Sequence, residues 1–188
     1  MAKNTVVNLR TEAGASIFKS KLADSLTLSR GIISLVILSL SLIGKDAYLA
    51  VVILSLVGGA TDMFDGKAAR RYLKSRESRL GRYDLEIDTF LILCIIGYFT
   101  ISGIVIPRVA GFVWIGLAVA AAVLYNRRPK ALIMFEVPSV LIVLTATGLY
   151  DLKIFLAVIA PVFLVGVVIN YKRVLYLLFE HYPRIFSR

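Results

Sequence analysis

Several residue types are scarce in this sequence, and each scarcity narrows the classes of protein to which it can belong. The 188 residues include one cysteine, Cys94, so an intramolecular disulfide is excluded, and its place inside an apolar run indicates packing. They include one histidine, His181, which has no companion at metal-ligand spacing and is expected to be a solvated tail residue. The N-terminal segment lacks a short apolar core with a small-residue cleavage site, so we expect no removable signal peptide. Internal repeats and long linkers are absent too, which favours a single domain over residues 1–188.

Apolar residues, by contrast, are abundant. They make up 59% of the chain, and the mean hydropathy of +0.82 is far above that of a soluble domain of this length. A helix crosses a bilayer with about 20 apolar residues. Six runs come close to that length: 27–45, 46–66, 84–106, 109–126, 131–150 and 152–170. The composition therefore predicts an all-α integral membrane protein, built as a single bundle of six transmembrane helices over residues 27–170.

A further helix is expected before the first of these runs, within the N-terminal segment 1–26. In residues 15–26 the apolar side chains Phe18, Leu22 and Leu26 recur at helical spacing, and the nearby lysines lie off that stripe. Two interpretations stay open. The segment is either a short amphipathic helix in the membrane interface or an ordinary cytoplasmic helix.

The basic residues are distributed unevenly along the chain. All but three of the 22 Lys and Arg fall on one side of the predicted bundle, and the exceptions are Lys45, Arg108 and Lys153. Cytoplasmic loops of membrane proteins carry such an excess. The pattern predicts that both termini, including the tail 171–188, are cytoplasmic in a multi-pass protein of the cell membrane. It also accounts for most of the net charge of +10, so we expect no nucleic-acid partner.

Four aspartates stand where two apolar runs meet their cytoplasmic ends. Asp62 and Asp65 are three residues apart and Asp84 and Asp88 are four apart, so each pair shares one face of its helix. Solvated helix ends paired with nearby arginines would explain Asp84 or Glu86 alone. Four carboxylates on two facing stripes at membrane depth are costly without a partner and are typical of a functional site. Hard oxygen ligands of this kind suit Mg²⁺ or Mn²⁺, which predicts a divalent-metal site with two ions.

The residues after the first pair of aspartates suit a phosphate-bearing ligand. Gly66 and Ala69 are small, so a flat ligand can come close, and Arg70 supplies a forked donor that matches phosphate geometry. Metal ions, an arginine and a floor of small residues together favour a nucleotide with a pyrophosphate group.

The whole pattern resembles the signature of the CDP-alcohol phosphotransferase family, which are integral-membrane enzymes of phospholipid assembly. The matching residues are Asp62-x-x-Asp65-Gly66-x-x-Ala69-Arg70, followed by Gly81, Asp84 and Asp88. One spacing departs from the family pattern, because two residues rather than the usual three separate Gly81 from Asp84. The stretch LTLSR, residues 26–30, is also similar to the family at the head of its first helix.

The resemblance implies a reaction and a set of roles. A phosphoalcohol group, such as phosphatidyl from CDP-diacylglycerol, would pass to the hydroxyl of an acceptor alcohol, and CMP would be released. Asp62, Asp65 and Asp84 would ligate two metal ions, and Asp88 would lie near them as the base that accepts the proton of the acceptor. The CDP moiety would be held by six further residues: Gly66, Ala69, Arg70, Gly81, Thr27 and Arg30. Membrane lipids would surround the enzyme, and family members suggest a homodimer.

Some questions stay open at this stage. Arg127, Arg128 and Lys130 could bind a phosphate on the acceptor, although the topology alone predicts cations there. The donor could also carry a small headgroup, with the lipid as acceptor.

Two rival functions remain. A divalent-cation transporter would also contain buried carboxylates, but such sites tend to lie at the midplane between repeats, and Glu136 is the only other acid well inside a run. A noncatalytic scaffold that binds anionic lipid through the loop 67–82 would explain the cations and leave the aspartates unexplained.

Overall fold

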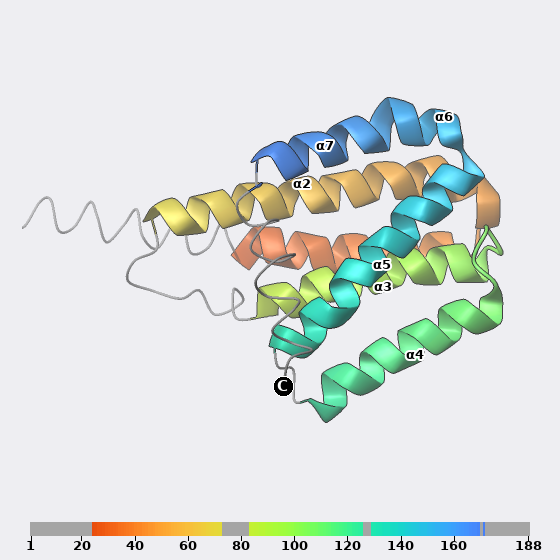
Figure 1. Ribbon diagram of the computed structural model, residues 1–188, viewed down its shortest axis with the longest axis horizontal. Helices are drawn as coiled ribbons and strands as arrows, with labels where there is room; N and C mark the ends of the chain where they lie inside the picture. Colours follow the sequence, from red (N-terminus) through yellow and green to blue (C-terminus); the bar gives the residue numbers. More distant parts are fainter. Residues whose placement is uncertain (1–23, 73–82, 126–128, 170, 172–188) are drawn as a thin grey trace, which may run out of the picture.

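The computed structural model describes residues 24–72, 83–125, 129–169 and 171, and this part of the chain contains helices and turns but no strand. Six helical stretches run back and forth beside one another (Figure 1). In chain order they are a helix over 24–40, α2 (Tyr48–Tyr72) after a 3₁₀ turn at Gly44–Ala47, α3 (Asp84–Ile101), α4 (Arg108–Leu124), α5 (Pro129–Tyr150), and a last stretch made of α6 (Leu152–Ile154), a π-helical segment (Phe155–Ile159) and α7 (Ala160–Ile169). Their number and order agree with the six predicted apolar runs.

Three of the described stretches are long and apolar enough to cross a membrane: Gly44–Thr61, Leu132–Tyr150 and Leu152–Ile169. The helix Arg108–Leu124 is apolar but shorter. Asp84, Glu86 and Asp88 make the start of α3 acidic, and Arg30 interrupts the apolar stretch of the first described helix. These charges lie in the stretches where the site is predicted.

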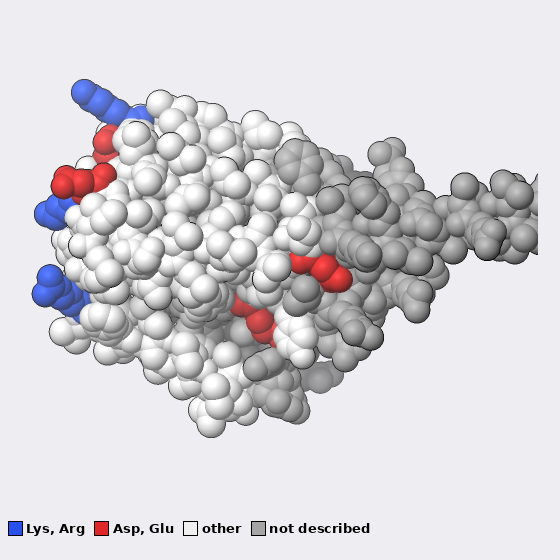
Figure 2. Space-filling model, turned by 180° about the vertical axis from the view of Figure 1, so that it is seen from behind, with Lys and Arg blue, Asp and Glu red and all other residues white. Residues whose placement is uncertain are grey.

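The outer surface of the described part is apolar, as expected of a protein in contact with lipid. Large apolar side chains are widely exposed, among them Leu42, Val109 and Leu124. The face in Figure 2 shows a broad uncharged band, with the described Lys and Arg side chains of this face at one end beside acidic ones, and further acidic side chains next to the part that is not described. Soluble monomeric proteins rarely expose so much apolar surface.

Among the helices labelled in Figure 1, α3 packs most extensively against α5, then against α4. Its second half is buried on several sides, with Cys94, Ile96, Tyr98 and Phe99 all close to zero exposure. The ring of Tyr48 at the start of α2 lies edge-on to the ring of Phe99 at a centroid distance of 6.3 Å. Cys94 is therefore a packed core residue, as the sequence predicts.

The first described helix runs along α3 in the same direction. Arg30 is paired with Asp88, and further along Leu38 approaches Gly97, where an added Cβ would lie 3.2 Å from the Leu38 Cδ1 atom. Beyond the end of this helix, the hydroxyl of Tyr98 donates to the carbonyl oxygen of Gly44 at 2.8 Å. Two helices separated by one intervening span must point the same way in an up-and-down bundle.

The π-helical segment in the last stretch has a cause in the sequence. Pro161 has no backbone N–H and its ring would collide with the carbonyl oxygen of Ala157, four residues earlier, in a regular α-helix. The helical turn is wider there, and the N–H of Ala160 donates to the carbonyl oxygen of Phe155, five residues earlier. The chain thus stays helical past the proline, from Leu152 to Ile169.

A glycine lets α4 lie against α3. A Cβ atom at Gly111 would overlap the side chain of Thr100, which is fully buried and whose hydroxyl donates to the carbonyl oxygen of Ile96 at 2.7 Å. Gly116, on the same helix, has nothing within 4 Å of its Cβ position. The close approach of the two helices therefore depends on Gly111.

We expect Gly111→Ala to lower the free energy of unfolding by about 1–3 kcal/mol, because the added methyl group overpacks the contact with Thr100. The matched variant Gly116→Ala should be neutral or slightly stabilising, since alanine favours helix by up to about 1 kcal/mol over glycine. Thermal unfolding of both purified variants in detergent measures this. Equal midpoints would contradict the packing described for α3 and α4.

Candidate active site

The structure brings together two of the predicted site residues from distant parts of the chain. Arg30, on the helix over 24–40, forms an ion pair with Asp88, on the second turn of α3, and its Nη1 donates to the Asp88 Oδ1 atom. The side chain of Arg30 is 0% exposed and that of Asp88 is 19% exposed. Sequence reasoning had assigned both residues to the site but had not predicted their pairing.

The position of Arg30 follows from the pattern of its helix. Thr27, Arg30, Ser34 and Ile37 are all fully buried and recur at intervals of three and four residues. This is the spacing of one helix face. The hydroxyl of Ser34 donates to the carbonyl oxygen of Arg30 at 2.7 Å, so it is satisfied within its own helix. The polar residues of this buried face, Thr27, Arg30 and Ser34, therefore lie near the start of α3.

Because the pair is buried, replacing both partners and removing only one have very different effects on stability. A buried ion pair gains little over a well-packed apolar replacement, but loss of one partner leaves a buried charge, which costs about 3–5 kcal/mol. Arg30 therefore holds the Asp88 carboxylate in one place. A guanidinium fork also fixes carboxylate geometry better than an ammonium group does.

Asp88 also faces a cavity of about 500 Å³. Pockets for small molecules usually have volumes of about 300–1,000 Å³. Its walls come from α2, α3, α5, the π segment and α7, and they are apolar apart from a few side chains. The α2 wall includes Gly58, Gly59 and Ala60, which come directly before the first aspartate pair in the sequence. The cavity thus reaches the part of α2 that leads into the predicted metal site.

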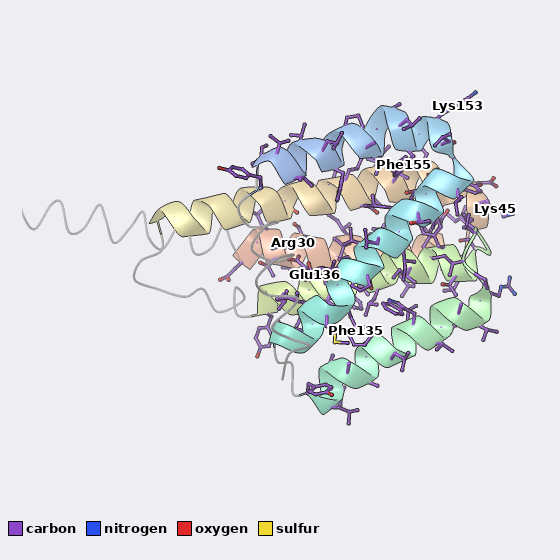
Figure 3. The ribbon with its side chains drawn as sticks, in the orientation of Figure 1. Arg30, Lys45, Phe135, Glu136, Lys153 and Phe155 are labelled. Atoms are coloured by element: carbon purple, nitrogen blue, oxygen red, sulfur yellow. The ribbon has the colours of Figure 1, made fainter. Side chains whose placement is uncertain are left out.

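Glu136 is a second carboxylate in the lining of this cavity, contributed by α5. It lies seven residues into α5, about 10 Å along the helix, and Asp88 lies four residues into α3, about 6 Å along. Figure 3 shows Glu136 and Arg30 toward the end of the molecule opposite Lys45 and Lys153. Sequence reasoning had noted Glu136 as an isolated acid inside a run but had given it no role in the site.

The backbone supports the helical spacing assumed for the aspartates. α2 runs without interruption through Asp62 and Asp65 to Tyr72, and α3 begins at Asp84. The side chains of Asp62, Asp65, Ala69, Arg70 and Asp84 lie outside the described part, as do those of Lys130 and the segments that hold Gly81, Arg127 and Arg128. Gly66 is placed only as a backbone position in α2. Within the side chains that are described, no group of three metal ligands occurs, so the metal site stays a prediction.

Comparison with known proteins identifies one family. Residues 20–178 match the family model described as CDP-alcohol phosphatidyltransferase. The match covers every described helix and both aspartate pairs. No curated protein and no solved structure matched the chain.

We expect Arg30→Met to lower the free energy of unfolding by about 3–5 kcal/mol, because the mostly buried Asp88 carboxylate loses its counter-charge. The double variant Arg30→Met, Asp88→Leu should recover most of that loss, since no charge is left buried. Lys45→Met, which removes an exposed cation, serves as the control and should change stability by less than about 0.5 kcal/mol. Thermal or denaturant unfolding in detergent gives the values. A double variant as unstable as the single one would show that the ion pair is not what stabilises this contact.

Proposed function

Because the chain belongs to the CDP-alcohol phosphatidyltransferase family, we propose that it transfers a phosphatidyl group from a CDP-alcohol such as CDP-diacylglycerol to the hydroxyl of an acceptor alcohol and releases CMP. The observation that carries this proposal is the family match over residues 20–178. The helical aspartate pairs on α2 and α3 support it, because the same segments supply the carboxylates that the chemistry requires.

In this proposal the aspartates hold two divalent cations, Mg²⁺ or Mn²⁺. The donor set fits, since Asp62 and Asp65 share one face of α2 and Asp84 and Asp88 share one face of α3, and carboxylate oxygens are the ligands that these ions prefer. The bound ions would neutralise charge on the diphosphate and on the departing CMP. Gly66, Ala69 and Arg70 would hold the CDP moiety, and Gly81, Thr27 and Arg30 would complete its surroundings.

Asp88 would accept the proton of the acceptor hydroxyl as that oxygen attacks the β-phosphorus of the donor. Placement within about 3 Å of the hydroxyl is what allows such a transfer. The ion pair with Arg30 and the position on the cavity wall both restrict where the Asp88 carboxylate can lie. Arg30 is thus a positioning residue for Asp88 as well as a neighbour of the nucleotide.

We further propose that all six helical stretches cross the cell membrane, that both termini are cytoplasmic, and that the protein is a homodimer. Successive helices alternate in direction (Figure 1), and Lys45 and Lys153 lie at the end away from Arg30 (Figure 3). A site at the cytoplasmic end lets a water-soluble nucleotide meet a substrate whose tails lie in the bilayer.

The acceptor is less narrowly defined. Arg127, Arg128 and Lys130 would suit a phosphate on the acceptor, and the same cations follow from the topology. A donor with a small headgroup and a lipid acceptor is the alternative assignment within the same family.

A divalent-cation transporter is the rival from another class. The observation in its favour is that Asp88 and Glu136 line one cavity. Release of CMP distinguishes an enzyme from a transporter.

The purified protein should release CMP from CDP-diacylglycerol only with an acceptor alcohol and Mg²⁺ or Mn²⁺, and a chelator should abolish this activity. Asp62→Asn should lower the rate at least about 100-fold, because a metal ligand and charge on the diphosphate site are lost together. Glu86→Gln is the matched control and should retain metal dependence, since Glu86 points about 200° around the helix from Asp84. Cation uptake into vesicles without CMP release would instead establish transport.

A reporter fused after Arg188 should be accessible only from the cytoplasmic side, because the basic segments lie there. A second reporter in the turn at Gly103, between α3 and α4, should be accessible only from the outside. Protease protection in oriented vesicles measures both. The opposite result would place the aspartates at the outer face and contradict the proposed access of a cytoplasmic nucleotide to the site.

A further inference from the structure

A second cavity, of about 480 Å³, lies between α3, α4 and α5. It is at the end of the bundle away from Asp88, where the turn from α3 to α4 meets the end of α5 (Figure 1). Its floor is buried, with Ile96 and Ala146 only 1% and 2% exposed, whereas Leu141 and Leu149 on its rim are 57% and 71% exposed. Both rim residues lie within the membrane-spanning stretch of α5. The second cavity therefore opens toward the hydrocarbon that surrounds the helices.

The polar side chains on the wall of the second cavity already have partners. The indole N–H of Trp114 donates to the hydroxyl oxygen of Ser139 at 2.9 Å, and the hydroxyl of Thr145 donates to the carbonyl oxygen of Leu141 at 2.8 Å. The other lining side chains are apolar. An apolar cavity of this kind excludes water and takes up apolar molecules. In a bilayer the apolar molecule at hand is the acyl chain of a lipid.

A positive charge stands beside the mouth of this cavity. Pro107 lines the cavity, and Arg108, the next residue, begins α4 and is exposed. The first turn of α4 contains no acid, and no side chain caps its N–H groups. Asp151, the acid closest in sequence to the wall, instead accepts from the N–H of Ile154 at 3.0 Å. A guanidinium group and the N-terminus of a helix both favour a phosphate, so this end suits an anionic headgroup.

We propose that the second cavity and the start of α4 form a binding site for one anionic phospholipid, with an acyl chain in the cavity and the phosphate beside Arg108. Trp114 lies seven residues from Pro107, about 10 Å along α4, so the chain reaches at least that depth. A zwitterionic lipid brings an ammonium group toward the same positive end and binds less tightly. The site is separate from the aspartates, and the inference does not depend on the proposed function.

The chain has one tryptophan, Trp114, and it lines the second cavity, so its fluorescence reports on what occupies that cavity. The purified protein in detergent is titrated with phosphatidylglycerol or phosphatidylcholine brominated along the acyl chains, because bromine quenches indole fluorescence on contact. Half-maximal quenching should require at least about fivefold less phosphatidylglycerol than phosphatidylcholine, since one arginine near a membrane surface contributes about that factor to the binding of an anionic lipid.

Two pairs of variants test the two parts of the site. Arg108→Gln should bring the two lipids to within about twofold of each other. Lys153→Gln, which removes another exposed cation at the same end, is its matched control and should keep the wild-type preference. Ala110→Phe fills the cavity from its wall and should reduce the maximal quenching by both lipids. Ala120→Phe, at an exposed position of α4 outside the wall, should leave the quenching unchanged.

All four variants change exposed side chains and should fold, which circular dichroism checks. Equal quenching by the two lipids in the wild-type protein would overturn the inference, as would a loss of preference in Lys153→Gln as large as that in Arg108→Gln. Unchanged quenching in Ala110→Phe would show that the lipid chains reach Trp114 by another route and would also overturn it. Absence of quenching by either lipid would overturn it as well, and cross-linking in the same detergent would then show whether a second copy of the chain covers the cavity.

Discussion

A charged side chain that is buried in this bundle needs an opposite charge beside it, and Arg30 and Asp88 form such an ion pair. Arg30 is fully buried, and Asp88 keeps a small opening to the cavity. The pair therefore ties the first described helix to α3 at the end where the aspartates lie. From there the two helices run in the same direction, with further contacts at Gly97 and Tyr98. Helix α3 also packs against α4 and α5. The ion pair therefore positions the first described helix relative to the helix that these other two pack against.

Buried hydroxyl groups also need a partner, and here they find it within their own helix. Ser34, Ser55, Thr100 and Thr147 each donate to a carbonyl oxygen about one turn back in their own helix, so they can be buried without partners from other helices. Carboxylates cannot do this, since an ionised carboxylate has no proton to donate. The polar residues of the described interior are therefore of two kinds. Some form their hydrogen bonds within their own helix, and others require an opposite charge or a hydrogen-bond donor from elsewhere. Asp88 and Glu136 belong to the second kind, and both face the cavity.

Local sequence patterns were enough to predict the helices and the family. The six apolar runs correspond to the six helical stretches, α3 begins at the Asp84 proposed as its start, and Cys94 is packed in the core. Helical spacing could not reveal which residues meet across helices, because that depends on the rotation of each helix about its axis. The pairing of Arg30 with Asp88 was therefore missed, although both residues had been assigned to the site. Glu136 was missed for a related reason: no second acid stands at helical spacing from it in the sequence, and only the cavity connects it with Asp88. The predicted metal set, the six crossings and the cytoplasmic termini stay predictions.

The π-helical segment before Pro161 also decides which residues form the last wall of the cavity. A π turn accommodates one residue more than an α turn, so every later side chain is rotated by about 100° relative to an uninterrupted helix. Val162, Phe163, Gly166 and Val167 line the cavity on that rotated register. Which side of α7 faces the cavity is therefore set by the number of residues in Phe155–Ile159 as much as by the residues themselves. In a comparison of related chains, a one-residue gap in this segment would turn α7 by about 100° about its axis and bring different side chains to the cavity, even where every side chain beyond the gap was identical.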